Sequence, residues 1–145
     1  MEIIVGTVTV KNNKILMVKE AKKEIYGKWA FPAGHLDVNE TLFEGAKRET
    51  LEETGCNVEI KKAFPILTNN FKDKGIMLFH FLAEPIEETG KYDQNEIIET
   101  KWIDIDEMKQ MKAEEFRSHT IVESILANLK NKDLYELGMI KEFKL

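Results

Sequence analysis

The sequence has one cysteine, Cys56, and no long hydrophobic run among its 145 residues. A single cysteine cannot form an internal disulfide, which fits a reducing compartment and predicts a cytoplasmic protein. A membrane-spanning helix needs about 20 apolar residues in succession, and no stretch of this sequence approaches that length. The first residues also lack the basic and then apolar pattern of a secretory signal peptide. We therefore expect no membrane partner.

The chain also has fewer basic than acidic residues. The chain has 21 lysines and arginines against 26 aspartates and glutamates, a formal net charge of −5. This balance argues against general nucleic-acid binding, although a local basic site could still hold a nucleotide. No linker rich in proline, glycine or serine divides the chain, and no internal repeat is present. Its length and ordinary composition predict that residues 1–145 form a single domain.

Hydrophobic patterning predicts a mixture of strands and helices. Short apolar runs predict strands over residues 3–10, 15–18, 58–67, 76–82 and 101–103, the first two joined as a hairpin. Helical spacing and capping residues predict helices over residues 42–54, 105–111 and 118–130. Residues 133–145 fit no single pattern. The irregular mixture favours a mixed sheet flanked by helices over a helical bundle or a barrel.

An acidic cluster on the first helix is the most informative feature. Glu49, Glu52 and Glu53 stand at positions i, i+3 and i+4, so in a helix their side chains point roughly the same way. Like charges at this spacing repel, and a bound divalent cation such as Mg²⁺ would offset the cost because it prefers carboxylate oxygens.

The helical wheel weighs this reading against a plainer one. Acidic helices are usually solvated, and Glu44 with Arg48 could be an ordinary ion pair four residues apart. A solvated face would lie opposite the apolar positions of the helix. At about 100° per residue the carboxylates instead continue the apolar stripe, so burial without a metal would be costly. The stripe comprises Leu42, Gly45, Ala46, Glu49 and Glu53, with Glu52 at its edge.

A longer pattern surrounds this cluster and resembles a known motif. The pattern G-x5-E-x7-R-E-U-x-E-E-x-G-U, in which U is apolar, is the box of the Nudix hydrolases, and the chain is similar to the MutT-like kind. Thr50 and Cys56 stand at the two apolar positions. The resemblance implies the family's α/β (α+β) fold, an α/β/α sandwich with a mixed β-sheet. The matching residues are Gly34, Glu40, Arg48, Glu49, Glu52, Glu53 and Gly55.

The resemblance also implies a reaction and its residues. Members hydrolyse a pyrophosphate bond in a nucleoside di- or triphosphate, or in a related nucleoside-diphosphate derivative, with Mg²⁺ or Mn²⁺. By position, the expected metal ligands are Glu49, Glu52, Glu53 and the carbonyl of Gly34. Glu53 is also a candidate general base. Arg48 and Glu40 are expected to orient the carboxylates.

A further acidic residue is expected outside the box. Many relatives place one in a loop shortly before a strand that contains tryptophan, and Glu96 stands six residues before Trp102. We expect Glu96 to be an additional metal ligand or the base, with Glu99 as the runner-up. The plainer alternative is an ordinary solvated loop.

Other polar residues carry weaker expectations. His80 lies between two phenylalanines of an expected strand, which is more typical of a structural or partly exposed histidine than of a catalytic one. Lys22 and neighbouring lysines could attract a polyphosphate, although a solvated loop is the simpler reading.

The expected substrate class depends mainly on which substrate-specific motifs the sequence lacks. The sequence lacks the downstream proline of ADP-ribose hydrolases, the tyrosine of dinucleoside-polyphosphate hydrolases and the upstream motif of coenzyme A hydrolases. The remaining candidates are an enzyme that acts on (deoxy)nucleoside triphosphates, oxidised or not, and a phosphatase of broader specificity. A nucleotide-binding or regulatory module without catalysis is the alternative, but such a module has no reason to keep a repulsive glutamate cluster. Homodimers are common in the family, so a homodimer is one expected assembly.

Overall fold

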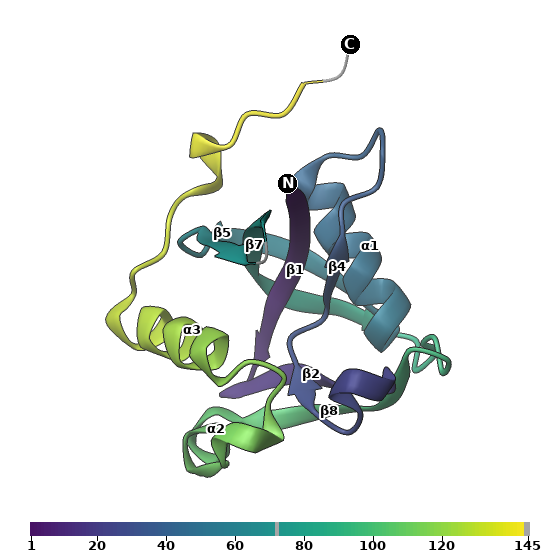
Figure 1. The fold of residues 1–145 in the computed structure, drawn as a ribbon. Coiled ribbons are helices and arrows are strands. Elements are labelled where there is room, and N and C mark those ends of the chain that lie inside the picture. Colours follow the sequence, from purple (N-terminus) through teal and green to yellow (C-terminus); the bar gives the residue numbers. More distant parts are fainter. Residues whose placement is uncertain (72, 144–145) are drawn as a thin grey trace.

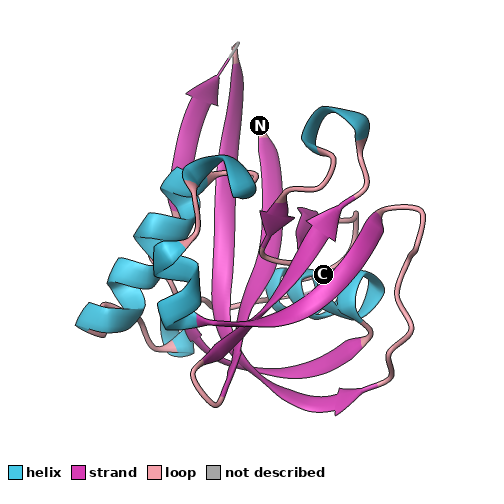
Figure 2. Cartoon of the chain, turned by 90° about the horizontal axis from the view of Figure 1, so that it is seen from below, coloured by secondary structure: helices cyan, strands magenta, loops and turns pink. Residues whose placement is uncertain are grey.

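The structure is a computed structural model that describes residues 1–71 and 73–143. Its strands form one mixed sheet with helices on both sides (Figures 1 and 2). No helix of the described residues is long and apolar enough to cross a membrane. The strands are β1 (Glu2–Lys11), β2 (Lys14–Glu20), β3 (Trp29–Ala30), β4 (Ala33–His35), β5 (Cys56–Ala63), β6 (Leu67–Phe71), β7 (Lys74–Glu88) and β8 (Ile97–Asp104). The α-helices are α1 (Leu42–Thr54), α2 (Ile105–Gln110) and α3 (His119–Asn131), and short 3₁₀ helices cover Lys23–Ile25, Ala113–Glu115 and Leu137–Met139.

Strand β1 organises the sheet. It pairs with β2 as the expected antiparallel hairpin, in parallel with β7, and antiparallel with the short strand β4. Strand β8 extends the sheet beyond β2, while β5 and β6 both pair with β7. Parallel and antiparallel pairs together confirm the predicted mixed sheet.

The two faces of β1 pack against different helices, because successive strand residues point to opposite faces. Val5 packs with Ala46 of α1 and Phe81 of β7. Val8 packs on the other face with Val122 and Ile125 of α3. Figure 1 shows the resulting arrangement, with α1 on one side of β1 and α3 on the other. This confirms the predicted sandwich.

Glycine at position 6 lets β4 lie close against β1. A Cβ atom at Gly6 would meet the Pro32 carbonyl oxygen and the Ala33 side chain. In its absence the amide of Thr7 donates to the Pro32 carbonyl at 3.1 Å. Strand β4 is thereby held where the box begins, with Gly34 opposite Val5.

Two predicted strands have different bounds in the structure. The strand predicted over residues 58–67 is divided, because β5 ends at Ala63 and β6 begins at Leu67. Between them Phe64 turns into the core, where it is 2% exposed, and Pro65 has no amide to donate. Strand β7 is longer than predicted and continues past Pro85. Its pairing with β1 ends at Ala83, so no amide is needed there for that neighbour.

The remaining predictions differ mainly in length. Strand β8 starts at Ile97, earlier than predicted, while α2 and α3 agree with the expected helices within about one residue. The C-terminal segment, which fitted no pattern, runs along the end of β5. There Tyr135 exchanges two backbone hydrogen bonds with Ala63, at 2.8 and 2.9 Å. Residues 144 and 145 lie outside the described residues.

Candidate active site

Helix α1 begins and ends as its sequence predicts. The Thr41 hydroxyl accepts from the Glu44 amide at 3.2 Å, and the Glu44 carboxylate accepts from the Thr41 amide at 3.1 Å, which completes a capping box. Gly55 ends the helix in the left-handed conformation, with φ of 72°. These two ends fix the rotation of α1 and therefore the direction of its carboxylates.

The carboxylates of α1 lie where the wheel places them. Glu53 is 6% exposed, and the Glu49 side chain is 12% exposed. The Glu52 side chain, at the edge of the stripe, is 54% exposed. Thr50 also faces inward, and its hydroxyl lies 2.7 Å from the Thr7 hydroxyl. A threonine at this apolar position of the box is thus buried with its hydrogen bonds satisfied.

Strand β4 holds both buried carboxylates. The Ala33 amide donates to Glu53 Oε1 at 2.9 Å. The Glu49 carboxylate packs directly against the Cα atom of Gly34, in space that any side chain there would fill. The box glycine is required because it gives the carboxylate access to the strand backbone.

Arg48 joins the other box residues. Its Nε and Nη2 atoms donate to the two oxygens of Glu40, at 2.9 and 2.7 Å, and Nη1 donates to Glu49 at 2.8 Å and to Glu52 at 3.2 Å. Nη2 also donates to the His35 carbonyl at 3.0 Å. The Arg48 hydrogen bonds lower the pKa of Glu40 and its carboxylate partners raise the pKa of Arg48. One guanidinium therefore hydrogen-bonds to three carboxylates, and its Nε atom also lies 3.3 Å from the carboxylate of Asp37.

Arg48 does not neutralise the whole site. Burial raises the pKa of Glu53 to about 8. The hydrogen bond from the Ala33 amide lowers this pKa, but by less than burial raises it. Burial also raises the pKa of Glu49, against the lowering effect of Arg48. Negative charge on Glu49, Glu20 and Glu96 adds to the cost at Glu53. A bound cation would lower the free-energy cost of keeping both carboxylates charged.

Glu96 lies beside this cluster. Its loop is tied to the end of α1, because the Asp93 amide donates to the Glu52 carbonyl at 2.9 Å. The Glu96 carbonyl accepts from Ala21 at 2.9 Å, just after β2. Its charge acts on both Glu49 and Glu53. Glu99 points instead to Lys19, with 3.9 Å between their charged atoms, so the geometry favours Glu96.

Glu20 was missed by the sequence reasoning. It ends β2 next to a register shift and is only 4% exposed. Its Oε1 atom lies 3.2 Å from Nη1 of Arg117, which precedes α3. A carboxylate at the end of an otherwise apolar strand was the available signal, but its partner lies 97 residues away in sequence.

The donor set fits a hard divalent cation. Glu49, Glu53 and Glu52 offer carboxylate oxygens, which Mg²⁺ and Mn²⁺ prefer, and the space above Gly34 brings one of them to the strand backbone. Within the described residues, no three acidic, histidine or cysteine side chains are already gathered as a metal-binding group. Arg48 instead holds Glu49 and Glu52 by ion pairs, so a cation would have to compete with it.

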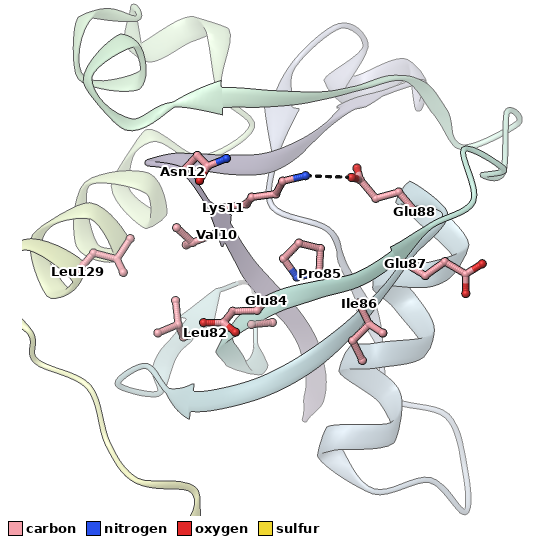
Figure 3. A pocket seen from close by; sticks show the side chains of 11 residues that line it. Val10, Lys11, Asn12, Leu82, Glu84, Pro85, Ile86, Glu87, Glu88 and Leu129 are labelled. Carbon is pink, nitrogen blue, oxygen red and sulfur yellow. Dashed lines mark ion pairs between the residues drawn. The ribbon is translucent and has the colours of Figure 1, made fainter.

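A cavity on another part of the protein lies away from these residues. It measures about 670 Å³ and opens between the end of β1 and the second half of β7. Figure 3 shows Lys11 and Glu88 across it, joined by an ion pair of 3.6 Å. None of the box residues lines it. We therefore place the candidate site at α1 and β4.

Known proteins are similar to this chain in sequence. The NUDIX domain family model matches residues 2–123. Phosphatase NudJ of Shigella boydii is 33% identical over 146 residues, which cover 97% of this chain and 91% of that protein. The 8-oxo-dGDP phosphatase NUDT18 of Danio rerio is 33% identical over 134 residues, covering 88% of this chain and 38% of that protein. The chain spans only 28% to 38% of the NUDT18 relatives from mouse, zebrafish and human.

Solved structures share the fold. A NUDIX hydrolase from Nitrosomonas europaea superposes with a TM-score of 0.87 at 24% identity, covering 98% of this chain and 97% of that chain. A UDP-X diphosphatase superposes with a TM-score of 0.74 at 20% identity, covering 93% of this chain and 65% of that one. At these identities the likeness concerns the fold alone.

Proposed function

The chain belongs to the Nudix hydrolase family, and from this premise we propose that it is a Mg²⁺-dependent hydrolase of a pyrophosphate bond in a nucleoside di- or triphosphate or a related nucleoside-diphosphate derivative. The observation that carries the proposal is the pair of buried carboxylates, Glu49 and Glu53, held against the backbone of β4. A module that only bound nucleotides would gain nothing from burying them together.

The metal would be held by Glu49, Glu52 and Glu53, with the Gly34 carbonyl as a further oxygen ligand. Mn²⁺ suits the same donors. Bound there, a divalent cation supplies neutralisation of the phosphate charge and lowers the pKa of a bound water. Arg48 orients two of these carboxylates, and Glu40 in turn fixes the plane of Arg48 through two hydrogen bonds.

Proton transfer falls to a carboxylate beside the attacking water. Glu53 has one oxygen occupied by the Ala33 amide, which leaves the other free to accept a proton. Glu96 is exposed and lies near the same two buried carboxylates. We propose that Glu53, which is also a metal ligand, or Glu96 is the general base, and that Glu96 is an additional ligand if it is not the base.

The substrate class follows from the relatives only as a proposal. NUDT18 is described as an 8-oxo-dGDP phosphatase and NudJ as a phosphatase. We propose that this enzyme acts on (deoxy)nucleoside di- or triphosphates, with oxidised purine forms as the first candidates.

A substrate panel tests the function. Nucleoside di- and triphosphates, their 8-oxo forms, ADP-sugars and dinucleoside polyphosphates are incubated with the protein and Mg²⁺, and released phosphate and pyrophosphate are measured. We expect hydrolysis that EDTA abolishes, that Glu53→Gln reduces at least 100-fold, and that Glu59→Gln, a matched change on the exposed side of β5, leaves intact. A folded parent that hydrolyses nothing in the panel would support the non-catalytic alternative.

Three broader expectations remain proposals. Shared packing of Ile60 between two of the core clusters supports one domain over residues 1–145. The single cysteine, Cys56, is buried and unpaired, which supports a cytoplasmic enzyme.

Exposed Ile66, Tyr135 and Met139 around one apolar cavity support a homodimer. Light scattering coupled to size-exclusion chromatography tests the assembly, and a monomer mass at micromolar concentration would reject it.

A further inference from the structure

A second cavity adjoins the candidate site. It measures about 290 Å³ and lies between β4, the start of β7 and α3. Ala33 and Gly34 line it, and these two residues also contact Glu53 and Glu49. The cavity and the carboxylates therefore share β4 as a wall. Its volume is near the lower end of small-molecule pockets, about 300 Å³, which suits one ring system rather than two.

The cavity is lined by apolar residues and by two basic ones. Leu78 and Ile121 line it from β7 and α3, and Trp29 offers an indole ring on which a flat aromatic group can stack. Lys22 and Arg117 bring positive charge to the same cavity. Arg117 is half exposed, so its guanidinium can contact a phosphate while it remains near Glu20. This combination suits an aromatic group that carries phosphates.

His80 is the buried polar group in this wall. It is 5% exposed and contacts the Phe31 ring edge-on, with 5.8 Å between ring centroids. Its Nδ1 atom is buried and has no hydrogen-bond partner among the described residues. Burial lowers the pKa of His80 to about 4, so the ring is neutral near pH 7 and offers one donor and one acceptor. An unpartnered buried polar atom costs about 1–3 kcal/mol.

A ligand is better placed than the protein to complete His80. The cavity on its other side, of about 340 Å³, is lined largely by apolar side chains such as Phe64, Phe79 and Ile140. The cavity beside β4 is also lined by Asn69 and Ser118, so it is more polar than the other cavity. It is also the cavity that adjoins the carboxylates.

We propose that this cavity binds the nucleobase of the substrate and that His80 is the residue that selects among bases, by hydrogen bonding to their polar edge. The inference rests on the proposed function, since it takes the substrate to be a nucleotide. A pocket built to hydrogen-bond a polar group rejects ligands that lack it, because its own buried group is then left unpaired. His80 would thus set specificity while the box residues perform the reaction.

Nucleotide binding in the absence of metal tests the inference separately from hydrolysis. The chain has two tryptophans, so Trp102→Phe leaves Trp29, in the cavity wall, as the only indole fluorophore. In this background the fluorescence of Trp29 is titrated with the monophosphates of deoxyguanosine, 8-oxo-deoxyguanosine, deoxyadenosine, deoxycytidine and thymidine, with EDTA present. Ribose 5-phosphate serves as the probe without a base.

We expect one base to bind at least tenfold more tightly than the others. His80→Phe should remove this preference, His80→Gln should restore part of it, and neither should alter binding of ribose 5-phosphate. Ile121→Phe, which adds volume to the cavity wall and no second indole, should weaken every nucleotide. Urea unfolding verifies that each variant is folded.

The outcomes are distinct from those of the substrate panel. Equal affinity for all five bases in the parent, as a water on His80 would produce, overturns the proposal. So does a preference that survives in folded His80→Phe, or the absence of any Trp29 response to nucleotides. Base-selective binding without Mg²⁺-dependent hydrolysis would instead reject the proposed function and leave the base pocket standing.

Discussion

Replacing Glu53 by glutamine should stabilise the metal-free protein while it destroys the enzyme. Burial raises the pKa of Glu53 from 4.5 to about 8. Between these values the folded chain holds one proton more than the unfolded chain, so the parent loses stability as the pH rises through this window. At about 1.4 kcal/mol per pH unit, the loss by pH 7 is roughly 3 kcal/mol. Glutamine is neutral in both states, and its carbonyl can still accept from Ala33.

Urea unfolding followed by circular dichroism, with EDTA present, measures the effect. At about pH 7.5 Glu53→Gln should be more stable than the parent by about 4 kcal/mol, and at about pH 4.5 the two should be nearly equal. Mg²⁺ at 100 times its Kd should add about 2.7 kcal/mol to the parent and far less to the variant. A stability difference that is independent of pH would refute the assignment of a buried, costly carboxylate.

Three further predictions concern neighbouring residues. Glu96→Gln should lower kcat for nucleotide hydrolysis far more than Glu99→Gln, and equal losses would contradict the role of Glu96. Gly34→Ala should place a methyl group in the space of the Glu49 carboxylate and reduce Mg²⁺-dependent activity at least tenfold while circular dichroism remains native, whereas full activity would exclude that contact from the site. Thr41→Ala should cost about 1 kcal/mol of stability in urea unfolding by loss of the helix cap, and a cost near zero would show that the capping box is not needed.

The elements that local sequence specifies were predicted well. The bounds of α1 follow from a capping box and a terminal glycine, and these features act within one turn of the helix. Strand ends were predicted less well. The division at Phe64 and the continuation past Pro85 depend on which neighbouring strand is present, and a single sequence does not contain that information.

The site divides in the same way. Glu49 and Glu53 were predicted to face inward because helical periodicity relates them to Ala46. The roles of Ala33 as a donor to Glu53 and of Glu20 as a nearby charge depend on packing between distant segments. His80 was expected to be structural or partly exposed, and it is buried. Only the structure shows that the Nδ1 atom of His80 lacks a partner among the described residues and that His80 lines the cavity beside β4.

Binding of Mn²⁺, followed by the electron paramagnetic resonance signal of the free ion, tests the metal site directly. The parent and the exposed control Glu59→Gln should bind Mn²⁺ with the same affinity. Glu49→Gln and Glu53→Gln should each weaken binding at least tenfold, because each removes a charged oxygen ligand. A folded parent that binds no Mn²⁺, or variants at both positions that bind it as tightly as the parent, would contradict the assignment of a divalent cation to the carboxylates of α1.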